Sequence, residues 1–217
     1  MEKYKTNKSL TIFMKAVIFD FDGVIIDSYE SNYQCHKKKF EGIGYEEHKS
    51  FFEGNVHEIR EGLVKSGKIK NNPSLDIHTL LREHLLNKQV IDAKVRKVLI
   101  KLKEKYPLFI ISSFRGEYIE EFLEKHNASD IFKEILGSEH HKKKDIKFNL
   151  LFDKYNLSKD NCVFITDTLG DILEANKVKI KTIAVDFGFH EKERLEKGNP
   201  YKIISCFEDI VKVVDEM

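Results

Sequence analysis

Six short apolar runs alternate with helix-patterned stretches along this chain, and this alternation constrains its fold more than any other feature. The predicted strands are Ala16–Phe19, Leu108–Ile111, Lys133–Leu136, Val163–Thr166, Thr182–Val185 and Lys202–Ile204. The helical patterns between them include Glu117–Lys125, Ile146–Tyr155 and Asp171–Lys177. Strands that are apolar throughout and separated by helices form parallel sheets covered on both faces. We therefore predict an α/β fold with a Rossmann-like, doubly wound parallel sheet.

The alternation is interrupted once, between Ser28 and Ile91, where the sequence is polar, helix-patterned and without a convincing strand. Pro73, after two asparagines, indicates a break between helices. A loop of this length without its own structure is not expected in a compact domain. We therefore predict that residues 28–92 form a small inserted domain of about four or five helices, and that residues 1–27 and 93–217 form the core.

The composition argues against polyanionic and membrane partners. The 217 residues include 37 basic and 36 acidic side chains, a formal net charge of +1, which gives no global attraction for nucleic acid. No apolar run approaches the ~18 residues of a membrane span, and the N-terminus lacks the features of a signal peptide. Met14 lies just before the first predicted strand, so we expect residues 1–13 to be an extension or a misassigned start.

Cysteine usage favours a reducing compartment. Cys35, Cys162 and Cys206 are odd in number and show no C-x-x-C spacing, which is typical of a protein without a disulfide framework or a zinc site. Each is expected to pack as a small buried hydrophobe. We therefore expect a cytoplasmic protein.

The first predicted strand runs into an acidic motif, KAVIFDFDGVIIDS, from Lys15 to Ser28. Asp20 and Asp22 cannot both be buried without partners, because an unpaired buried carboxylate is strongly destabilising. Asp-Gly between two apolar runs is typical of a β-hairpin turn. The alternative is a carboxylate pair at the carboxyl end of a parallel strand, where open α/β sheets bind ligands. The motif alone leaves both interpretations open.

Polar side chains follow three further predicted strands in a fixed order. LFIISS ends in Ser112 and Ser113, the lysines of HHKKKDIK follow ILG, and CVFITDTLGD contains Asp167 and Asp171. Each has an ordinary explanation alone, as a helix N-cap, as an acid near a helix start or as a solvated loop that opens a helix. Because the carboxyl ends of parallel strands meet at one edge, we expect these side chains to share one crevice.

Together these motifs resemble those of the haloacid dehalogenase superfamily, hhhDxDGxhhDS, hhh(S/T), a lysine and hhhxDxxxD. The matching segments are VIFDFDGVIIDS, FIISS, a lysine within HKKKD, and VFITDTLGD, and they span residues 16 to 171. The insertion and the downstream run TIAVDFGFHEKERLEKGNPYKII resemble the phosphoglycolate-phosphatase-like and β-phosphoglucomutase-like branch. The resemblance implies that residues 28–92 are a helical cap, and that a short flap hairpin follows the first aspartates.

The resemblance also implies a Mg²⁺-dependent phosphatase that works through an aspartyl-phosphate. Asp20 would be the nucleophile, and the Asp22 side chain would act first as general acid and then as general base. The metal ligands would be the Asp20 carboxylate, the Asp22 backbone carbonyl and Asp167. Asp171 would orient these ligands or their waters from behind.

The same resemblance implies three groups that hold the phosphoryl oxygens. These are the Ser112 hydroxyl, the Ser113 backbone N–H and a lysine that neutralises charge beyond the reach of the metal. The branch usually has Lys-Pro, which is absent here, so Lys144 and Lys142 are both candidates, and we favour Lys144. Thr166 stands where the family commonly has glycine. We expect this difference to change the local backbone conformation and not the metal site.

Other activities remain open. A phosphosugar mutase would need a cap site for a bisphosphorylated sugar, and a receiver-type phosphoacceptor domain would carry its nucleophile on a later strand than its acid pair. A phosphonate hydrolase would need a cap lysine as Schiff base. The cap lysines available for that role are Lys37, Lys38, Lys39, Lys49, Lys65 and Lys68.

The expected substrate is a small phosphorylated metabolite, bound by a monomer or homodimer. In the family that the chain resembles, the cap sets specificity, and the cap sequence names no substrate. Arg60, His57 and Arg115 are candidate substrate contacts, although the protein surface is the ordinary location for each.

Overall fold

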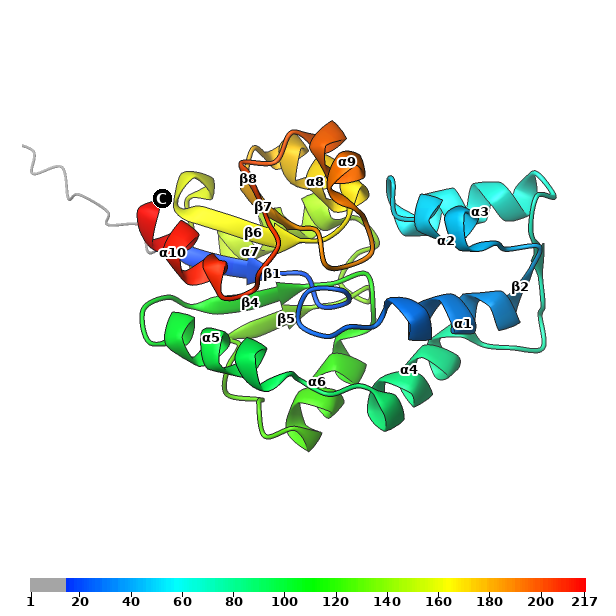
Figure 1. The fold of residues 1–217 in the computed structure, drawn as a ribbon, viewed down its shortest axis with the longest axis horizontal. Coiled ribbons are helices and arrows are strands. Elements are labelled where there is room, and N and C mark those ends of the chain that lie inside the picture. Colours follow the sequence, from blue (N-terminus) through cyan, green and yellow to red (C-terminus); the bar gives the residue numbers. More distant parts are fainter. Residues whose placement is uncertain (1–14) are drawn as a thin grey trace, which may run out of the picture.

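The core is a six-stranded sheet with the order β5-β4-β1-β6-β7-β8 (Figure 1). We describe it from a computed structural model of residues 15–217, so the expected extension at residues 1–13 lies outside the described residues. The strands are β1 Ala16–Phe19, β4 Leu108–Ile111, β5 Glu134–Leu136, β6 Cys162–Thr166, β7 Lys181–Val185 and β8 Lys202–Ile204. All neighbours in this sheet pair in parallel. The predicted doubly wound sheet is therefore confirmed, with a switch point beside β1.

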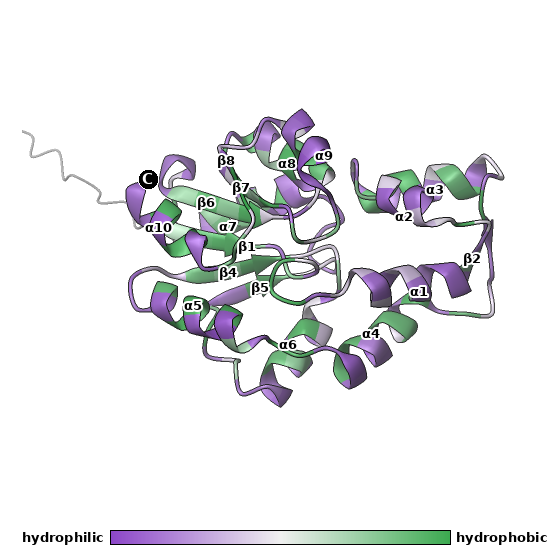
Figure 2. Cartoon of the chain, in the orientation of Figure 1, coloured by the Kyte–Doolittle hydropathy of each residue, from purple (hydrophilic) through white to green (hydrophobic). Residues whose placement is uncertain are grey.

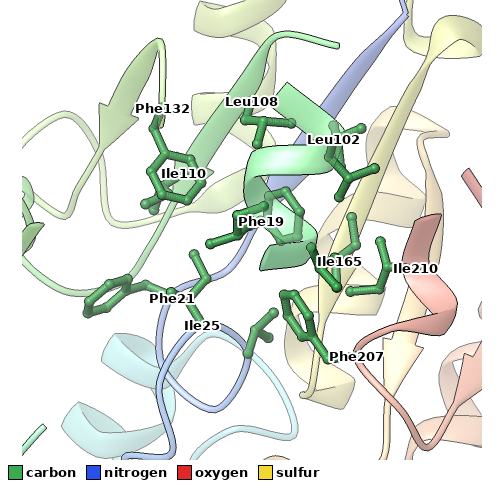
Figure 3. Packing of buried hydrophobic residues seen from close by; sticks show 14 of the residues in the cluster. Phe19, Phe21, Ile25, Leu102, Leu108, Ile110, Phe132, Ile165, Phe207 and Ile210 are labelled. Atoms are coloured by element: carbon green, nitrogen blue, oxygen red, sulfur yellow. The ribbon is translucent and has the colours of Figure 1, made fainter. Parts of the chain in front are cut away.

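Helices cover both faces of this sheet, because its strands are apolar on both sides. On one face Val17 and Phe19 pack with residues of three helices, α5 Ala93–Lys103, α6 Gly116–Lys125 and α10 Asp209–Glu216. Figure 3 shows Phe19 in this cluster together with Leu102 of α5 and Ile210 of α10. On the other face Ala16 and Ile18 pack with two helices, α7 Lys144–Tyr155 and α8 Leu169–Val178. Three shorter helical segments complete the described core. These are α9 Lys192–Leu195 and the 3₁₀ turns Lys159–Asn161, before β6, and Glu196–Gly198, after α9. In Figure 2, β4 and most of β6 are hydrophobic.

The segment between β1 and α5 adds no strand to the six-stranded sheet and extends to one side of it (Figure 1). Its elements are α1 Tyr29–Lys39, β2 Phe40–Glu41, α2 Tyr45–Ser50, α3 Val56–Lys65, β3 Lys70–Asn71 and α4 Ile77–Lys88. The expectation of a segment without strands is wrong in one detail, because β2 and β3 form a short antiparallel pair. We call this segment the cap; its predicted boundaries, residues 28–92, stay a prediction.

The cap contacts the core on two sides. Its helix α4 lies against α6, where Arg82 and Glu121 form a two-bonded ion pair (2.5 and 2.8 Å). On the other side Arg194 of α9 pairs with Glu46 and Glu53 (3.1 and 3.2 Å). These contacts seat the cap over the carboxyl edge of the sheet.

The cysteines differ in their environment. Cys35 and Cys162 are buried free thiols, as expected, whereas the free thiol of Cys206 is exposed in the loop after β8. The expectation of burial is therefore wrong for Cys206. Within residues 15–217 no helix is long and apolar enough to cross a membrane.

Candidate active site

The chain turns sharply where β1 ends. Gly23 has a φ of 72°, and a Cβ at this position would lie 1.9 Å from Oδ2 of Asp167, so only glycine fits. The Gly23 N–H donates to the Ile26 carbonyl (2.9 Å), which closes a compact turn in place of the two strands of a hairpin. This turn places Asp20 and Asp22 at the carboxyl edge of the sheet, facing the cap.

Lys144 lies between two of the predicted acids. Its Nζ is 2.8 Å from Oδ1 of Asp20 and 2.5 Å from Oδ2 of Asp171. The Thr166 hydroxyl donates to the same Asp171 oxygen (2.8 Å). Lys144 is 1% exposed, whereas Lys142 is exposed. The fold therefore brings Lys144, and not the alternative lysine, to the candidate nucleophile.

The remaining predicted residues flank this ion pair. Oδ1 of Asp22 accepts a hydrogen bond from the Ser28 hydroxyl (2.6 Å). The Ser112 hydroxyl accepts the N–H of Phe114 (3.0 Å), and Ser112 and Ser113 line the same cleft as the two aspartates. Ser112 is not a helix N-cap, because α6 begins after Arg115.

Asp167 is fully buried, and its two oxygens differ. Oδ2 accepts the N–H of Phe189 (2.7 Å), whereas Oδ1 has no hydrogen-bond partner within residues 15–217. Burial, helped by the charge of Asp171, raises the pKa of Asp167 to about 8. A buried carboxylate oxygen without a partner is strongly destabilising, so a ligand or ion at this position would stabilise the site.

The cluster contains four carboxyl groups, those of Asp20, Asp22, Asp167 and Asp171. Within the described residues one cation, Lys144, forms ion pairs with them. Burial raises the pKa of Asp20 and of Asp22, so a further positive charge here would favour their ionised forms. Residues 15–217 bring together no set of three His, Cys, Asp or Glu side chains in a metal-holding arrangement. Mg²⁺ needs few protein oxygens and keeps its waters, so two carboxylates and a backbone carbonyl fit it.

Two buried charged side chains beside the site were not predicted from the sequence. Lys147 is fully buried one turn after Lys144, and its Nζ donates to the backbone carbonyls of Ser112 and Gly137. Glu174 is 4% exposed and accepts the backbone N–H of Lys144 (2.8 Å). The expectation of a solvated loop for most of HHKKKDIK is wrong for Lys147, whereas Lys144 is the lysine that we favour for the site. Their spacing of three residues, which puts both on one helix face, was the available signal.

The two lysines have opposite electrostatic surroundings. Although burial opposes it, the charges of Asp171 and Asp20 raise the pKa of Lys144 above its usual value. Lys147 forms no ion pair with a carboxylate of residues 15–217, and burial lowers its pKa to about 7. Lys144 is therefore a permanent cation, whereas the charge of Lys147 depends on pH near neutrality.

A cleft between the sheet edge and the cap is lined by Lys144 and encloses about 750 Å³ of space, part of it open to solvent. The core contributes Asp20, Asp22, Ser112, Ser113, Lys144, Asp171 and Glu174 to its lining. The cap contributes the polar residues Asn32, His36, Asn55, His57, Arg60 and His78. The expected surface location is wrong for His57 and Arg60, which face the cleft. Arg115 lies outside it and pairs with Glu117 (2.7 Å).

Arg60 is held in the cleft by a neutral histidine. Nδ1 of His36 lies 3.0 Å from the Asn32 backbone carbonyl, so this nitrogen carries the proton. Nε2 of His36 is then the acceptor for Nη1 of Arg60, 3.2 Å away. Burial, together with the nearby His48 and Arg60, lowers the pKa of His36 well below its usual value, which keeps the ring neutral. Within residues 15–217 no carboxylate forms an ion pair with Arg60.

These features together define a recognisable class of α/β hydrolase. They are the doubly wound sheet, the Asp-x-Asp turn, the strand-end serine, the buried lysine and the second acid pair, all beneath an inserted cap. The family model described as haloacid dehalogenase-like hydrolase matches residues 17–185. This chain belongs to that family, as its motifs predict. The prediction of an enzyme of the family's phosphatase type is confirmed at this level.

The chain is similar to individual proteins whose names belong to the expected branch. A phosphoglycolate phosphatase of Photobacterium profundum is 23% identical over 219 residues, covering 93% of this chain and 96% of the relative. The structure of CbbY from Rhodobacter sphaeroides, solved with phosphate, has a TM-score of 0.74 at 14% identity and covers 91% of this chain and 96% of its own. A candidate β-phosphoglucomutase of Thermotoga maritima has a TM-score of 0.68 at 20% identity and covers 94% of this chain and 100% of its own. These structures show a shared fold.

Proposed function

We propose that this protein is a Mg²⁺-dependent phosphatase that hydrolyses a small phosphorylated metabolite through an aspartyl-phosphate. The observation that carries the proposal is the Asp20–Lys144–Asp171 ion pair in the cleft, with Asp22 two residues after Asp20. A carboxylate nucleophile, an ammonium for the phosphoryl oxygens and a second carboxyl group for proton transfer are the groups that such a reaction needs.

Asp20 and Asp22 have different roles in the two half-reactions. In the first, an Asp20 oxygen bonds to phosphorus while the bond to the ester oxygen breaks, and the protonated Asp22 gives its proton to the leaving alkoxide. In the second, Asp22 takes a proton from water as the water oxygen bonds to phosphorus and the bond to Asp20 breaks. Burial raises the pKa of Asp22, which favours the protonated form that the first step requires.

Mg²⁺ would be held by the Asp20 carboxylate, the Asp22 backbone carbonyl and Asp167, and when bound it would offset repulsion between the phosphate and the acids. Lys144, which pairs with Asp20 and Asp171, supplies a further positive charge. The Ser112 hydroxyl and the Ser113 N–H are the proposed donors to the phosphoryl oxygens.

The alternatives receive less support from the cleft. A phosphonate hydrolase would need a cap lysine facing the nucleophile, but none of the six candidates lines the cleft within the described residues. Lys49, for example, pairs with Glu191 at the edge of the cap (3.0 Å). A phosphosugar mutase remains a second candidate, because Arg60 and its histidines could hold a distal phosphate. The family match to a haloacid dehalogenase-like hydrolase argues against the receiver-type phosphoacceptor domain.

The cap end of the cleft supports a substrate with a second acidic group. Among residues 15–217, Arg60 has no carboxylate partner, and Nε2 of His57 and Nδ1 of His78 are buried without hydrogen-bond partners. An anionic oxygen would pair with the guanidinium and accept a hydrogen bond from whichever of these ring nitrogens carries a proton. Phosphoglycolate, the compound in the names of several relatives, has this chemistry. Cytoplasmic location and the monomer or homodimer state stay predictions.

A substrate panel with purified protein and Mg²⁺ tests the proposal. The panel contains 2-phosphoglycolate, neutral aryl phosphates, hexose 1-phosphates and a phosphonate. We expect release of inorganic phosphate, fastest from esters that carry a carboxylate. Conversion of a hexose 1-phosphate to the 6-phosphate would establish the mutase instead. Absence of phosphate release from every ester would overturn the proposed function.

A further inference from the structure

Asn55, the N-cap residue of cap helix α3, forms hydrogen bonds to the loop before Lys144 and to Glu174. The Nδ2 of Asn55 donates to the Lys142 backbone carbonyl and to Oε1 of Glu174, at 2.9 Å in each case. Oδ1 of Asn55 is already used, because it accepts the N–H groups of His57 and Glu58 as the N-cap of α3. The orientation of the Asn55 amide is therefore fixed by the cap itself.

Glu174 connects this cap contact to the catalytic lysine. Its Oε1 accepts from Asn55 and its Oε2 accepts the backbone N–H of Lys144 (2.8 Å). Lys143, the N-cap residue of α7, gives no side-chain hydrogen bond to the helix. The Glu174 carboxylate therefore supplies the acceptor and the negative charge that favour a helix N-terminus, at the residue whose Nζ reaches Asp20.

We propose that Asn55 and Glu174 form a latch that positions Lys144 only when the cap is seated on the core. This proposal rests on the proposed function, in which Lys144 holds the phosphoryl group. The cleft is lined by both cap and core, so a substrate must enter between them. When α3 moves away, the buried Glu174 loses its cap partner and the Lys142 carbonyl loses its donor, which loosens the turn before Lys144.

Exchanging the hydrogen-bond donor and acceptor between positions 55 and 174 distinguishes the proposed latch from ordinary packing of the cap on the core. Asn55→Asp keeps an oxygen to cap α3 but places a carboxylate against Glu174. Glu174→Gln keeps one acceptor for Lys144 and turns an amide donor towards position 55. We expect kcat/KM to fall about 10- to 100-fold in each single variant, the effect of losing one hydrogen bond to a charged group. The double variant restores the bond with donor and acceptor exchanged, and should recover about 10-fold over Asn55→Asp.

A matched control uses the neighbouring cross-interface contact. Glu58, on the same turn as Asn55, pairs with Lys143 (2.8 Å), but it is 62% exposed and does not touch Glu174. Glu58→Gln should change kcat/KM less than about 2-fold, because exposed ion pairs contribute little. An equal loss in this control would mean that any cap contact suffices, and would overturn the latch.

Amide hydrogen exchange gives a readout that does not depend on activity. The Gly170 N–H donates to the Phe52 carbonyl across the interface (2.8 Å) and reports cap seating, whereas the Lys144 N–H reports the latch. Asn55→Asp should accelerate exchange at both amides, and the double variant should slow it again. Unchanged Lys144 exchange in Asn55→Asp would overturn the proposal. If the wild type hydrolyses no phosphate ester, the proposed function fails, but the exchange results still decide whether the latch exists.

Discussion

The two ends of the cleft have opposite chemistry. The core end holds the buried carboxyl groups around Asp20, with Lys144 as the cation that pairs with them. The cap end holds Arg60 and several neutral histidines, with no acid paired to the guanidinium within residues 15–217. Under the proposed function, the core end would hold the phosphoryl group and the cap end a second anion. The reaction and the selectivity would then belong to different parts of the fold.

Substitution of the nucleophile should have the largest effect. Asp20→Asn removes the attacking oxygen, so turnover should fall to background while the fold is kept. The same loss is expected for every substrate, because the core end acts on the phosphoryl group that all of them share. Asp27→Asn is the matched control, since Asp27 belongs to the same motif but is exposed. Steady-state assays of both variants check the prediction, and residual substrate-dependent turnover in Asp20→Asn would assign the nucleophile elsewhere.

Metal removal tests the same end by a different route. Excess chelator should abolish activity, and Mg²⁺ should restore it. Because a dication would neutralise buried carboxylates, Mg²⁺ should also raise the melting temperature. At a Mg²⁺ concentration of 100 times its Kd, the free energy of unfolding should increase by about 2.7 kcal/mol. Asp167→Asn should remove most of this shift. Full activity in chelator, or an equal Mg²⁺ shift in Asp167→Asn, would contradict the assigned metal site.

The cap end should show an effect that depends on the substrate. Arg60→Met removes the guanidinium but keeps an apolar stem of similar length, so kcat/KM should fall about 10- to 100-fold for an ester with a second anion. A neutral aryl phosphate should change less than about 3-fold, because it offers Arg60 no partner. An equal loss for both substrates would remove the distinction between the two ends.

The core end could be predicted from sequence because its residues follow strand ends. Asp20, Ser112 and Asp167 each come directly after an apolar run, and parallel strands place these positions at one edge. His36, Arg60 and His78 lie on three different cap helices, so only tertiary packing brings them together. No local spacing marks such a set. The same holds for Asn55 and Glu174, which are far apart in sequence.

The smallest expected effect concerns the pH dependence of stability. Burial lowers the pKa of Lys147 from 10.5 to about 7, so between these values the unfolded chain binds more protons than the folded one. The free energy of unfolding of the wild type, relative to Lys147→Met, should therefore rise with pH from about 7 to 9.5, with a slope of at most about 1.4 kcal/mol per pH unit. Urea titrations measure it. Lys101→Met, which removes an exposed lysine of α5, is the control substitution.

Rapid-quench kinetics with an aryl phosphate test the central claim, that Asp20 carries the phosphoryl group and Asp22 moves the proton. An aryl leaving group needs little protonation, so Asp22→Asn should still release one equivalent of the phenol in a burst. Steady-state turnover should then be slower than wild type by about 10²- to 10⁴-fold, because hydrolysis of the aspartyl-phosphate lacks its base. Asp20→Asn should give no burst. A burst from Asp20→Asn, or wild-type turnover from Asp22→Asn, would contradict the account.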